Sequence, residues 1–428
     1  MPISKEQALE IVRRLSRGLP LEVLAQRLNP RPVEKIPAAP AVPRDEEDPA
    51  AGRDARLAFL KERGVETPYL AGRAPAPDAA FYRGNIENFV GLTQIPTGLI
   101  GPIRINGLHA HGDHYVPLAT SEGALVASYA RGAQILTLAG GVSALVTAEQ
   151  VQRAPGFVFE SLADAARFAA WATGEFEAFR AVAATRTKHG ELIDLQVHIE
   201  TRSVYMILSF HTGDASGQNM VTMCADAICH DIVERAPVKP SEWFVESNMS
   251  GDKKATVLSF LNTRGRRTMA EATIPRALVE EVLHTSPEMM CDYWQLSFIG
   301  GVQSGSIGVS GHIANGLAAV FLACGQDVAC VSEASVGVSR MELTDAGDLY
   351  CGIDLPNLIV GTVGGGTRLP TAAECLKIMG CQGEGSAPRF AEIVAGVLLG
   401  GELSIVGALC QGRFAHAHQT LGRRSPER

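Results

Sequence analysis

Four side chains of this 428-residue chain could together transfer protons and stabilise an oxyanion without a metal. They are two carboxylates, Glu122 and Asp327, one ammonium, Lys253, and one imidazole, His418. Carboxyl and imidazole groups donate and accept protons, and a fixed ammonium stabilises negative charge that develops on an oxygen. Each side chain lies in a distinctive segment: Ala119–Ser128, Gly251–Lys254, Ala323–Asp327 and His416–His418.

Each of these residues also has an ordinary structural explanation. Glu122 could place negative charge at a helix N-terminus, and Asp327 could cap the segment that follows it. Lys253 could belong to a solvated turn with Lys254, and His418 could lie in a frayed tail. The structural explanation is favoured for any one residue alone, whereas the four segments taken jointly and in this order favour a catalytic set.

The composition is typical of a multidomain globular protein without a nucleic-acid partner. A length of 428 residues exceeds one ordinary core and predicts two or three domains. The net charge is −8 with both signs spread along the chain, whereas a nucleic-acid surface is basic and clustered. Nine scattered cysteines without a Cys-x-x-Cys pair indicate free thiols, and therefore a cytoplasmic protein.

Neither a membrane span nor a secretory signal is expected. The N-terminus opens with charged residues, and no apolar segment follows it. The longest apolar candidate, Ala391–Cys410, contains Glu392, Glu402 and four glycines, whereas a membrane helix needs about 20 apolar residues. We expect this segment to form a buried amphipathic helix or a pair of helices.

The first 80 residues predict helices separated by a mobile linker. Apolar residues follow helical spacing up to about residue 30 and again over 53–63. Residues 30–55 carry repeated prolines and an acidic run, which is typical of a linker. Strands and turns begin near Phe81, and Ser121 is expected to cap a helix that runs to Leu138, with Glu122 in its first turn.

Residues 155–244 predict a separate αβ unit. A helix over 162–179 precedes strands over 195–199 and 204–208, and a Gly-rich turn at 213–219 then leads into a helix over 220–232. Such a turn presents backbone N–H groups and suits a phosphate. Farther along, a helix is expected over 312–323 and another Gly-rich turn over 361–367.

Six segments, in this order, resemble the catalytic domain of 3-hydroxy-3-methylglutaryl-coenzyme A (HMG-CoA) reductase, especially the eukaryote-type class. They are Glu87–Gly98, Ala119–Ser128, Asp214–Met220, Asp252–Lys254, Ala323–Asp327 and Gly361–Thr367. The resemblance covers roughly residues 81–424. It implies an α+β fold, in which a large domain surrounds a long central helix and carries an inserted small αβ cofactor-binding domain, without the membrane region of the animal enzymes.

The resemblance implies the following division of the chain. Residues 1–80 form an N-terminal helical segment and Pro-rich linker, 81–154 with 245–411 the large substrate-binding domain, 155–244 the small NADP-binding domain, and 412–428 a mobile C-terminal tail. The tail is expected to close over the thiol and the cofactor during turnover. The family also implies a homodimer with active sites at the subunit interface.

The implied reaction is NADPH-dependent reduction of an acyl-CoA thioester to a primary alcohol, with HMG-CoA giving mevalonate and coenzyme A in two hydride transfers. Lys253 would stabilise the oxyanion of each transfer, Glu122 would protonate the aldehyde oxygen, and His418 would protonate the departing thiolate. Asp327 would hold Lys253 and Glu122 together, and repulsion between the two carboxylates would raise one pKa toward neutrality.

Further residues match binding segments of the family. The substrate set is Ser128, Arg153, Asn248, Asp252, Lys254 and Asn315. The cofactor set is Asp214, Ser216, Gly217, Asn219, Met220, Gly364 and Gly365, with Arg186 at the 2′-phosphate of NADPH. Arg186 could equally be a surface charge.

Two positions depart from the family where it binds the distal carboxylate of the acyl group. The family lysine falls at Leu296 and a helping serine falls at Glu246, and neither side chain can pair a carboxylate. Ser247 could take the serine role, another cation could compensate, or the acyl group could lack that carboxylate. A homologue that binds ligand without catalysis is a further alternative, although all four catalytic residue types are retained.

A histidine cluster at residues 109–114 resembles a metal site but is not expected to be one. His109 and His111 would face the same side of a strand, as ligands can. Gly112 and Asp113, however, predict a hairpin turn, and hydride reduction needs no metal. We expect no metal cofactor.

Overall fold

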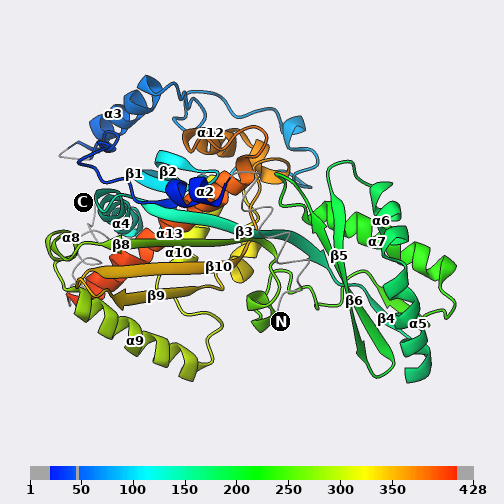
Figure 1. Ribbon diagram of the computed structural model, residues 1–428. Helices are drawn as coiled ribbons and strands as arrows, with labels where there is room; N and C mark the ends of the chain where they lie inside the picture. Colours follow the sequence, from blue (N-terminus) through cyan, green and yellow to red (C-terminus); the bar gives the residue numbers. More distant parts are fainter. Residues whose placement is uncertain (1–19, 45–47, 412–428) are drawn as a thin grey trace.

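The computed structural model describes residues 20–44 and 48–411, which form two lobes joined by a long strand (Figure 1). The large lobe holds β1 (Thr97–Gly107), β2 (His111–Ala119), β8 (Gly265–Ile274), β9 (Val338–Leu343) and β10 (Leu349–Leu358). The small lobe holds β4 (Gly156–Val158), β5 (Glu191–Glu200), β6 (Ser203–His211) and β7 (Glu242–Phe244). The expected α+β class is confirmed, whereas the exact domain boundaries remain predictions.

Strand β3 (Val142–Arg153) runs through both lobes and connects their sheets. Residues Ser143–Gln150 pair with β8, and Val151–Arg153 pair with β6. The strand order is β7-β4-β6-β3-β8-β10-β9, with β1 beside β3, β2 beside β1 and β5 beside β6. The strand changes partner between Gln150 and Val151, so the two lobes meet there and Arg153 lies just beyond, on the small-lobe side.

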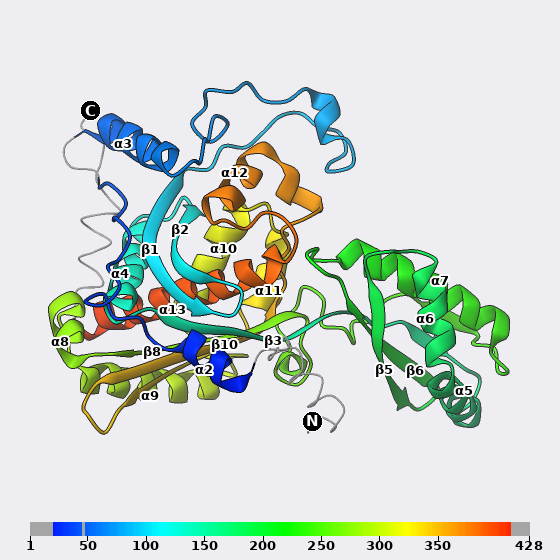
Figure 2. The same ribbon diagram turned by 45° about the horizontal axis from the view of Figure 1, so that its top comes forward.

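The large lobe is built around the long helix α13 (Ser386–Cys410), which is surrounded by other elements (Figure 2). Most of its residues are buried on all sides, so the expected amphipathic helix is instead an apolar core helix. It packs closely on α4 (Leu125–Leu138). A Cβ atom at Gly132 of α4 would lie 2.0 Å from the Gly400 carbonyl oxygen, so this contact requires a glycine.

By length and composition alone, α13 could also span a membrane. Within the described residues it is the one helix that passes this test, and 83% of its apolar window is buried inside the protein. A core helix surrounded by protein explains the same composition. Its two carboxylates, Glu392 and Glu402, are both buried and hydrogen-bonded to backbone amides of the large lobe.

Helices cover the remaining faces of the large sheet and connect its strands. They are α2 (Leu21–Leu28), α3 (Pro49–Glu62), α8 (Arg276–Leu278), α9 (Pro287–Ser304), α10 (Ile313–Ala323), α11 (Val331–Ala334) and α12 (Pro370–Ile378), with short turns η1 (Ala79–Tyr82), η2 (Val257–Phe260), η3 (Val279–Leu283), η4 (Val328–Cys330) and η5 (Gly365–Arg368).

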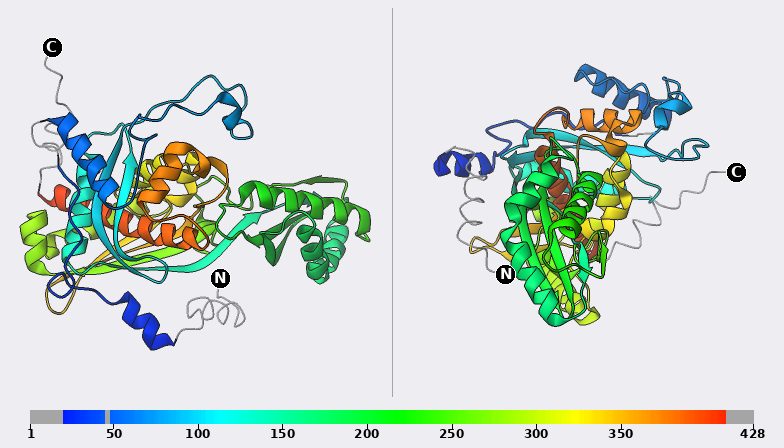
Figure 3. Two further views of the ribbon diagram at one scale, coloured as in Figure 1. Left: turned by 90° about the horizontal axis from the view of Figure 1, so that it is seen from above. Right: turned by 90° about the vertical axis from the view of Figure 1, so that its right-hand side faces the viewer.

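The small lobe packs three helices against its sheet and projects from the large lobe (Figure 3). These helices are α5 (Leu162–Gly174), α6 (Phe176–Ala184) and α7 (Gln218–Arg235). The single helix expected over 162–179 is divided at Glu175, where backbone angles leave the helical region. Phe157, Phe168 and Phe179 are fully buried between the layers and supply much of this core.

The expected mobile linker is wrong for residues 31–42, which are bound along β1 and β2. The buried Arg104 guanidinium donates to the carbonyls of Arg31, Ile36 and Pro37 and pairs with Asp113 at 2.7 Å. Asp113 also accepts from the amide of Ala39. The arm is therefore fixed, because Arg104 and Asp113 satisfy its backbone carbonyls and one of its amides.

Two local expectations near the site are also wrong. Helix α4 begins at Leu125 after Ala124, whose φ of 69° is left-handed, so Ser121 does not cap it and Glu122 precedes its first turn. The β1–β2 hairpin turns over residues 108–110. Gly112 and Asp113 therefore lie within β2. Asp113 binds the N-terminal arm of residues 31–42 and does not form a turn.

Candidate active site

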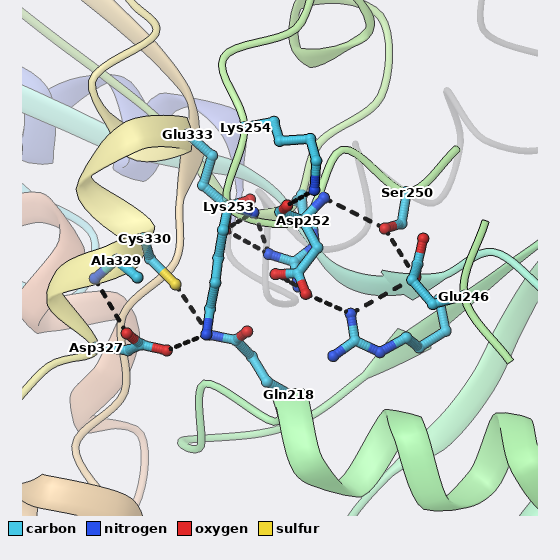
Figure 4. A network of polar contacts seen from close by, with 12 residues as sticks. Gln218, Glu246, Ser250, Asp252, Lys253, Lys254, Asp327, Ala329, Cys330 and Glu333 are labelled. Atoms are coloured by element: carbon cyan, nitrogen blue, oxygen red, sulfur yellow. Dashed lines mark hydrogen bonds and ion pairs between the residues drawn. The ribbon is translucent and has the colours of Figure 1, made fainter. Parts of the chain in front are cut away.

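Lys253 and Asp327 form an ion pair in which Nζ lies 2.9 Å from Oδ2 (Figure 4). Lys253 lies in the loop after β7, and Asp327 caps η4 by accepting from the amide of Ala329 at 3.1 Å. Each side chain is 43% exposed, so the ammonium is accessible. The hydrogen bond that the ammonium donates to Asp327 raises the pKa of Lys253 above its usual value, against the opposing effect of burial, and keeps the group cationic.

Beneath this pair, charged groups form a connected chain through the loop. Asp252 lies 2.8 Å from Arg153 and 2.8 Å from Arg264. Burial acts to raise the pKa of Asp252, but the two guanidinium groups hold it below its usual range. Arg153 also donates to Thr222 of α7 at 2.7 Å, so the chain of contacts reaches the small lobe.

Glu246, the residue expected to match the family serine, has contacts within the same loop. Its carboxylate accepts from the Asn248 amide at 2.7 Å and from the Ser250 hydroxyl at 3.0 Å, and lies 3.7 Å from Arg153. Ser247, the alternative serine, donates to the Ala154 carbonyl at 2.6 Å. Glu246 therefore fastens the loop, and its negative charge is partly compensated by Arg153.

Glu122 lines a cavity together with Asn315 of α10, whose side-chain amide donates to Glu122 at 2.8 Å. The cavity measures about 590 Å³. Its lining comprises Gln94, Ile95, Pro96, Ala119, Thr120, Ser121, Glu122, Leu125, Ala314, Asn315, Ala318, Ala319, Leu322 and Val331. Glu122 is the one charged residue in this lining, so the cavity offers a proton donor or acceptor against an apolar wall.

Of the two contacts expected for Asp327, the one with Lys253 is present and the one with Glu122 is not seen within the described residues. Asp327 pairs with Lys253, and Glu122 pairs with Asn315. No contact within the described residues joins Glu122 to Asp327. The two pairs are related through α10, because Asn315 lies in its first turn and Asp327 follows its end.

The turn before α7 is locked against the large lobe by Asp214. Its two carboxylate oxygens accept from the amides of Gly385 and Ala387, at 2.8 and 2.9 Å, at the start of α13. Ala215 forms a parallel bridge with Val363 of the second Gly-rich turn. The Asp214 carboxylate and this bridge therefore position the turn that precedes α7.

Buried carboxylates of α13 position two further segments of the site. Glu402 accepts from the amides of Gly311 and His312 at the start of α10, and Glu392 accepts from those of His109 and Ala110 in the β1–β2 turn. Burial raises the pKa of Glu402, and raises that of Glu392 to about 7. One central helix, α13, therefore holds both the helix that carries Asn315 and the hairpin that leads to Glu122.

The other predicted binding residues lie around these centres. Asn248 and Lys254 are exposed in the Lys253 loop, and Gly364 and Gly365 are exposed in the second Gly-rich turn. In the small lobe Asn219 and Arg186 are exposed, whereas Ser216, Gly217 and Met220 are partly or fully buried in and after the turn.

Ser128 faces α13 and hydrogen-bonds to Ser404, apart from the two centres. Leu296, the residue expected to match the family lysine, lies on α9 and is 72% exposed. His418 and the rest of the predicted tail lie outside the described residues.

Three residues of the site were not singled out from the sequence: Arg264, Glu333 and Gln218. Arg264 pairs with Glu333 beneath Lys253, and Gln218 at the start of α7 donates to the thiol of Cys330 at 3.0 Å. Burial raises the pKa of that thiol, which makes Cys330 a poor nucleophile. No sequence spacing marks these contacts, because each joins segments far apart in the chain.

The described part of the chain contains no group of three or more His, Cys, Asp or Glu side chains able to hold a metal ion. His111 and Asp113 belong instead to the neighbourhood of the N-terminal arm. Burial and the nearby Arg31 lower the pKa of His111.

Comparison with known proteins identifies the family. The model of the hydroxymethylglutaryl-coenzyme A reductase family matches residues 52–423. The 3-hydroxy-3-methylglutaryl-coenzyme A reductase of Pyrococcus abyssi is 40% identical over 376 residues, covering 86% of this chain and 91% of the relative. That of Methanothermobacter thermautotrophicus is 43% identical over 343 residues, covering 80% and 86%.

A solved structure has the same fold. It is the class II 3-hydroxy-3-methylglutaryl-CoA reductase from Streptococcus pneumoniae bound to NADPH in open conformations, with a TM-score of 0.67 and 20% identity. The match covers 83% of this chain and 96% of that chain. Since the family model spans most of the chain and the archaeal relatives share about two residues in five with it, this protein belongs to the hydroxymethylglutaryl-coenzyme A reductase family.

Proposed function

We propose that this protein reduces the thioester of HMG-CoA to mevalonate and free coenzyme A with NADPH. The observation that carries the proposal is the Lys253–Asp327 ion pair, an accessible ammonium fixed at 2.9 Å in a chain of this family. The archaeal relatives that bear the name of this activity match most of the chain.

In this mechanism Lys253 stabilises the oxyanion that develops when the thioester carbonyl, and later the aldehyde carbonyl, is reduced. A preorganised cation in a partly dehydrated site lowers the energy of such an oxyanion without reorganisation. Asp327 fixes the direction of the ammonium and raises its pKa, so Lys253 carries its charge over a wider pH range.

Glu122 is the proposed proton donor to the aldehyde oxygen. The Asn315 amide holds its carboxyl at 2.8 Å, which orients the group toward the cavity. The apolar wall contributed by α10 excludes water around the reacting carbon. His418 is proposed to protonate the thiolate of coenzyme A as it leaves.

The residues around the Gly-rich turn fit a dinucleotide phosphate. Gly217 has a φ of 73°, and a Cβ there would lie 2.3 Å from the Thr212 side chain, so the turn depends on glycine. The first amides of α7 would hold a phosphate, and Arg186 would pair with the 2′-phosphate of NADPH. NADPH, when bound, supplies the hydride.

A second candidate substrate is an acyl thioester without the distal carboxylate. It is favoured by Leu296, an exposed apolar side chain on α9, and by Glu246, a carboxylate in the Lys253 loop. Arg153 is already paired with Asp252 and Lys253 with Asp327, so a substrate carboxylate at this loop would have to meet Lys254.

NADPH oxidation separates these candidates. Purified protein is assayed with HMG-CoA and, in parallel, with acyl-CoAs of similar size that lack the second carboxylate. Turnover with HMG-CoA alone supports the first substrate, and turnover with the uncharged acyl groups alone supports the second. No NADPH oxidation with any thioester, by a folded protein that binds the nucleotide, would instead indicate a binding homologue.

We further propose a cytoplasmic homodimer. All nine cysteines are unpaired, which suits a reducing compartment. The segment before β1 exposes Ile86, Val90 and Leu92, and apolar residues of this kind are commonly covered by a partner. Light scattering coupled to gel filtration tests the assembly, with a dimer expected.

A further inference from the structure

The segment from Asp327 to Glu333 contacts Lys253 at both its side-chain ammonium and its backbone amide. Asp327, immediately before η4, lies 2.9 Å from the Lys253 ammonium. Glu333, in α11 directly after η4, accepts a hydrogen bond from the Lys253 backbone amide at 3.2 Å. Figure 4 shows the lysine side chain extended between these two carboxylates. Because both the backbone amide and the ammonium of Lys253 are held in place, the residue needs little reorganisation when a substrate binds.

The backbone of Lys253 needs such support. Its φ of 55° lies in the left-handed region, which is unfavourable for a residue with a Cβ atom. Asn248 and Gly251 in the same loop also have positive φ, at 67° and 73°. A strained loop of this kind persists where its surroundings determine it, and Glu333 is a contact from outside the loop.

Glu333 is itself held by Arg264, and both side chains are almost fully buried. One guanidinium nitrogen of Arg264 lies 2.6 and 2.7 Å from the two carboxylate oxygens of Glu333. Another lies 2.8 Å from Asp252, the residue before Lys253. Arg264 therefore connects the neighbour of Lys253 to the carboxylate that holds the Lys253 amide.

We propose that Glu333 and Arg264 are positioning residues of the reductase, which set the backbone of Lys253 so that its ammonium meets the thioester oxygen. The inference rests on the proposed function for the role of Lys253. Because Glu333 contacts the amide of Lys253 rather than its ammonium, its loss is expected to lower kcat and to leave nucleotide affinity unchanged.

The test uses Glu333→Gln in the full chain. We expect kcat for the thioester to fall by about 10- to 100-fold, as when a catalytic group is misplaced by about 1 Å, whereas the Kd for NADPH stays within about twofold. Hydrogen exchange of peptides covering residues 248–254 is expected to accelerate. In a Lys253→Ala background, Glu333→Gln is expected to cause no further loss of residual rate.

Asp354→Asn is the matched control. Asp354 pairs with Arg267 of β8 at 2.5 Å, and this pair does not touch the Lys253 loop. It should alter neither kcat nor exchange at residues 248–254. Arg264→Lys is a second variant for the case in which Glu333→Gln does not fold. Lysine cannot reach Glu333 and Asp252 in the same fork geometry, so kcat should fall there too.

An unchanged kcat in the folded variants would overturn the proposal. So would an equal loss in the Asp354→Asn control, or a further loss in the Lys253→Ala background. If wild-type protein reduces no thioester, the proposed function fails. Exchange at residues 248–254 then still decides whether Glu333 and Arg264 hold the loop, because it is measured without turnover.

Discussion

Lys253 and Asp327 lie 2.9 Å apart, although both side chains are 43% exposed to solvent. An ion pair with this exposure contributes roughly 0–1 kcal/mol to folding, because water screens it and two long side chains lose freedom. The small gain in folding stability is therefore a weak explanation for the pair, because the Lys253 backbone also adopts an unfavourable left-handed conformation. A fixed cation for oxyanion stabilisation accounts for the same geometry.

Replacement of Lys253 by Ala is expected to lower kcat by about 100- to 1000-fold, the size found when one oxyanion donor is removed. The melting temperature should change little, because the pair is exposed. Lys61→Ala, in the last turn of α3, is the charge-matched control and should leave the rate unchanged. Equal rates for wild type and the Lys253 variant would remove the ammonium from the mechanism.

Asp327→Asn is expected to move the basic limb of the pH–rate profile to lower pH. The hydrogen bond that Lys253 donates to Asp327 raises the pKa of Lys253, so loss of the carboxylate lowers that pKa toward its usual value. The reaction needs the protonated lysine, and its fraction then declines at a lower pH. Profiles of kcat recorded up to pH 10.5 or so test this shift, and coincident basic limbs would exclude it.

Asp214→Asn tests the lock between the cofactor turn and α13. The two hydrogen bonds to Gly385 and Ala387 at the helix N-terminus are charge-assisted, and their loss is expected to cost about 1–2 kcal/mol of unfolding free energy. NADPH binding should weaken, because the turn is no longer held. Asp226→Asn, on the exposed face of α7, is the control for both readouts.

Glu392 predicts a pH-dependent part of the stability. Burial raises its pKa to about 7, so the folded state binds a proton more tightly than the unfolded chain, where the value is near 4.5. The stabilisation is fully present below that unfolded value and declines as pH rises from about 4.5 to about 7, by at most about 3 kcal/mol. Glu392→Gln cannot titrate, so the difference between the two unfolding free energies should change with this slope. A difference independent of pH would show that Glu392 does not titrate in this window.

The sequence predicted the elements with strong local patterns. The helices over 220–232 and 312–323 and the strands over 195–199 and 204–208 are present with boundaries extended or shifted by a few residues, because their apolar periodicity is regular. The start of α4 was missed, because a left-handed Ala124 cannot be read from residue type. The fixed arm was missed because Arg104 binds it through carbonyls that are 67–73 residues away.

Site residues divide in the same way. Segments that resemble the family gave Glu122, Lys253 and Asp327, and the structure pairs Lys253 with Asp327. Arg264 and Glu333 lie 69 residues apart, and nothing in either segment indicates the other. Asp214 was expected at the cofactor, but its carboxylate is committed to α13, a contact that only tertiary structure can supply.

The most direct test of the account is the stoichiometry of the reaction with HMG-CoA, measured as NADPH oxidised per free thiol released. Reduction of a thioester to a primary alcohol requires two hydrides, so wild-type protein should oxidise two NADPH for each coenzyme A thiol and yield mevalonate. Lys253→Ala should show the same stoichiometry at a rate about 100- to 1000-fold lower. Release of thiol without NADPH oxidation, or no reaction by folded wild-type protein, would contradict the proposed reductase.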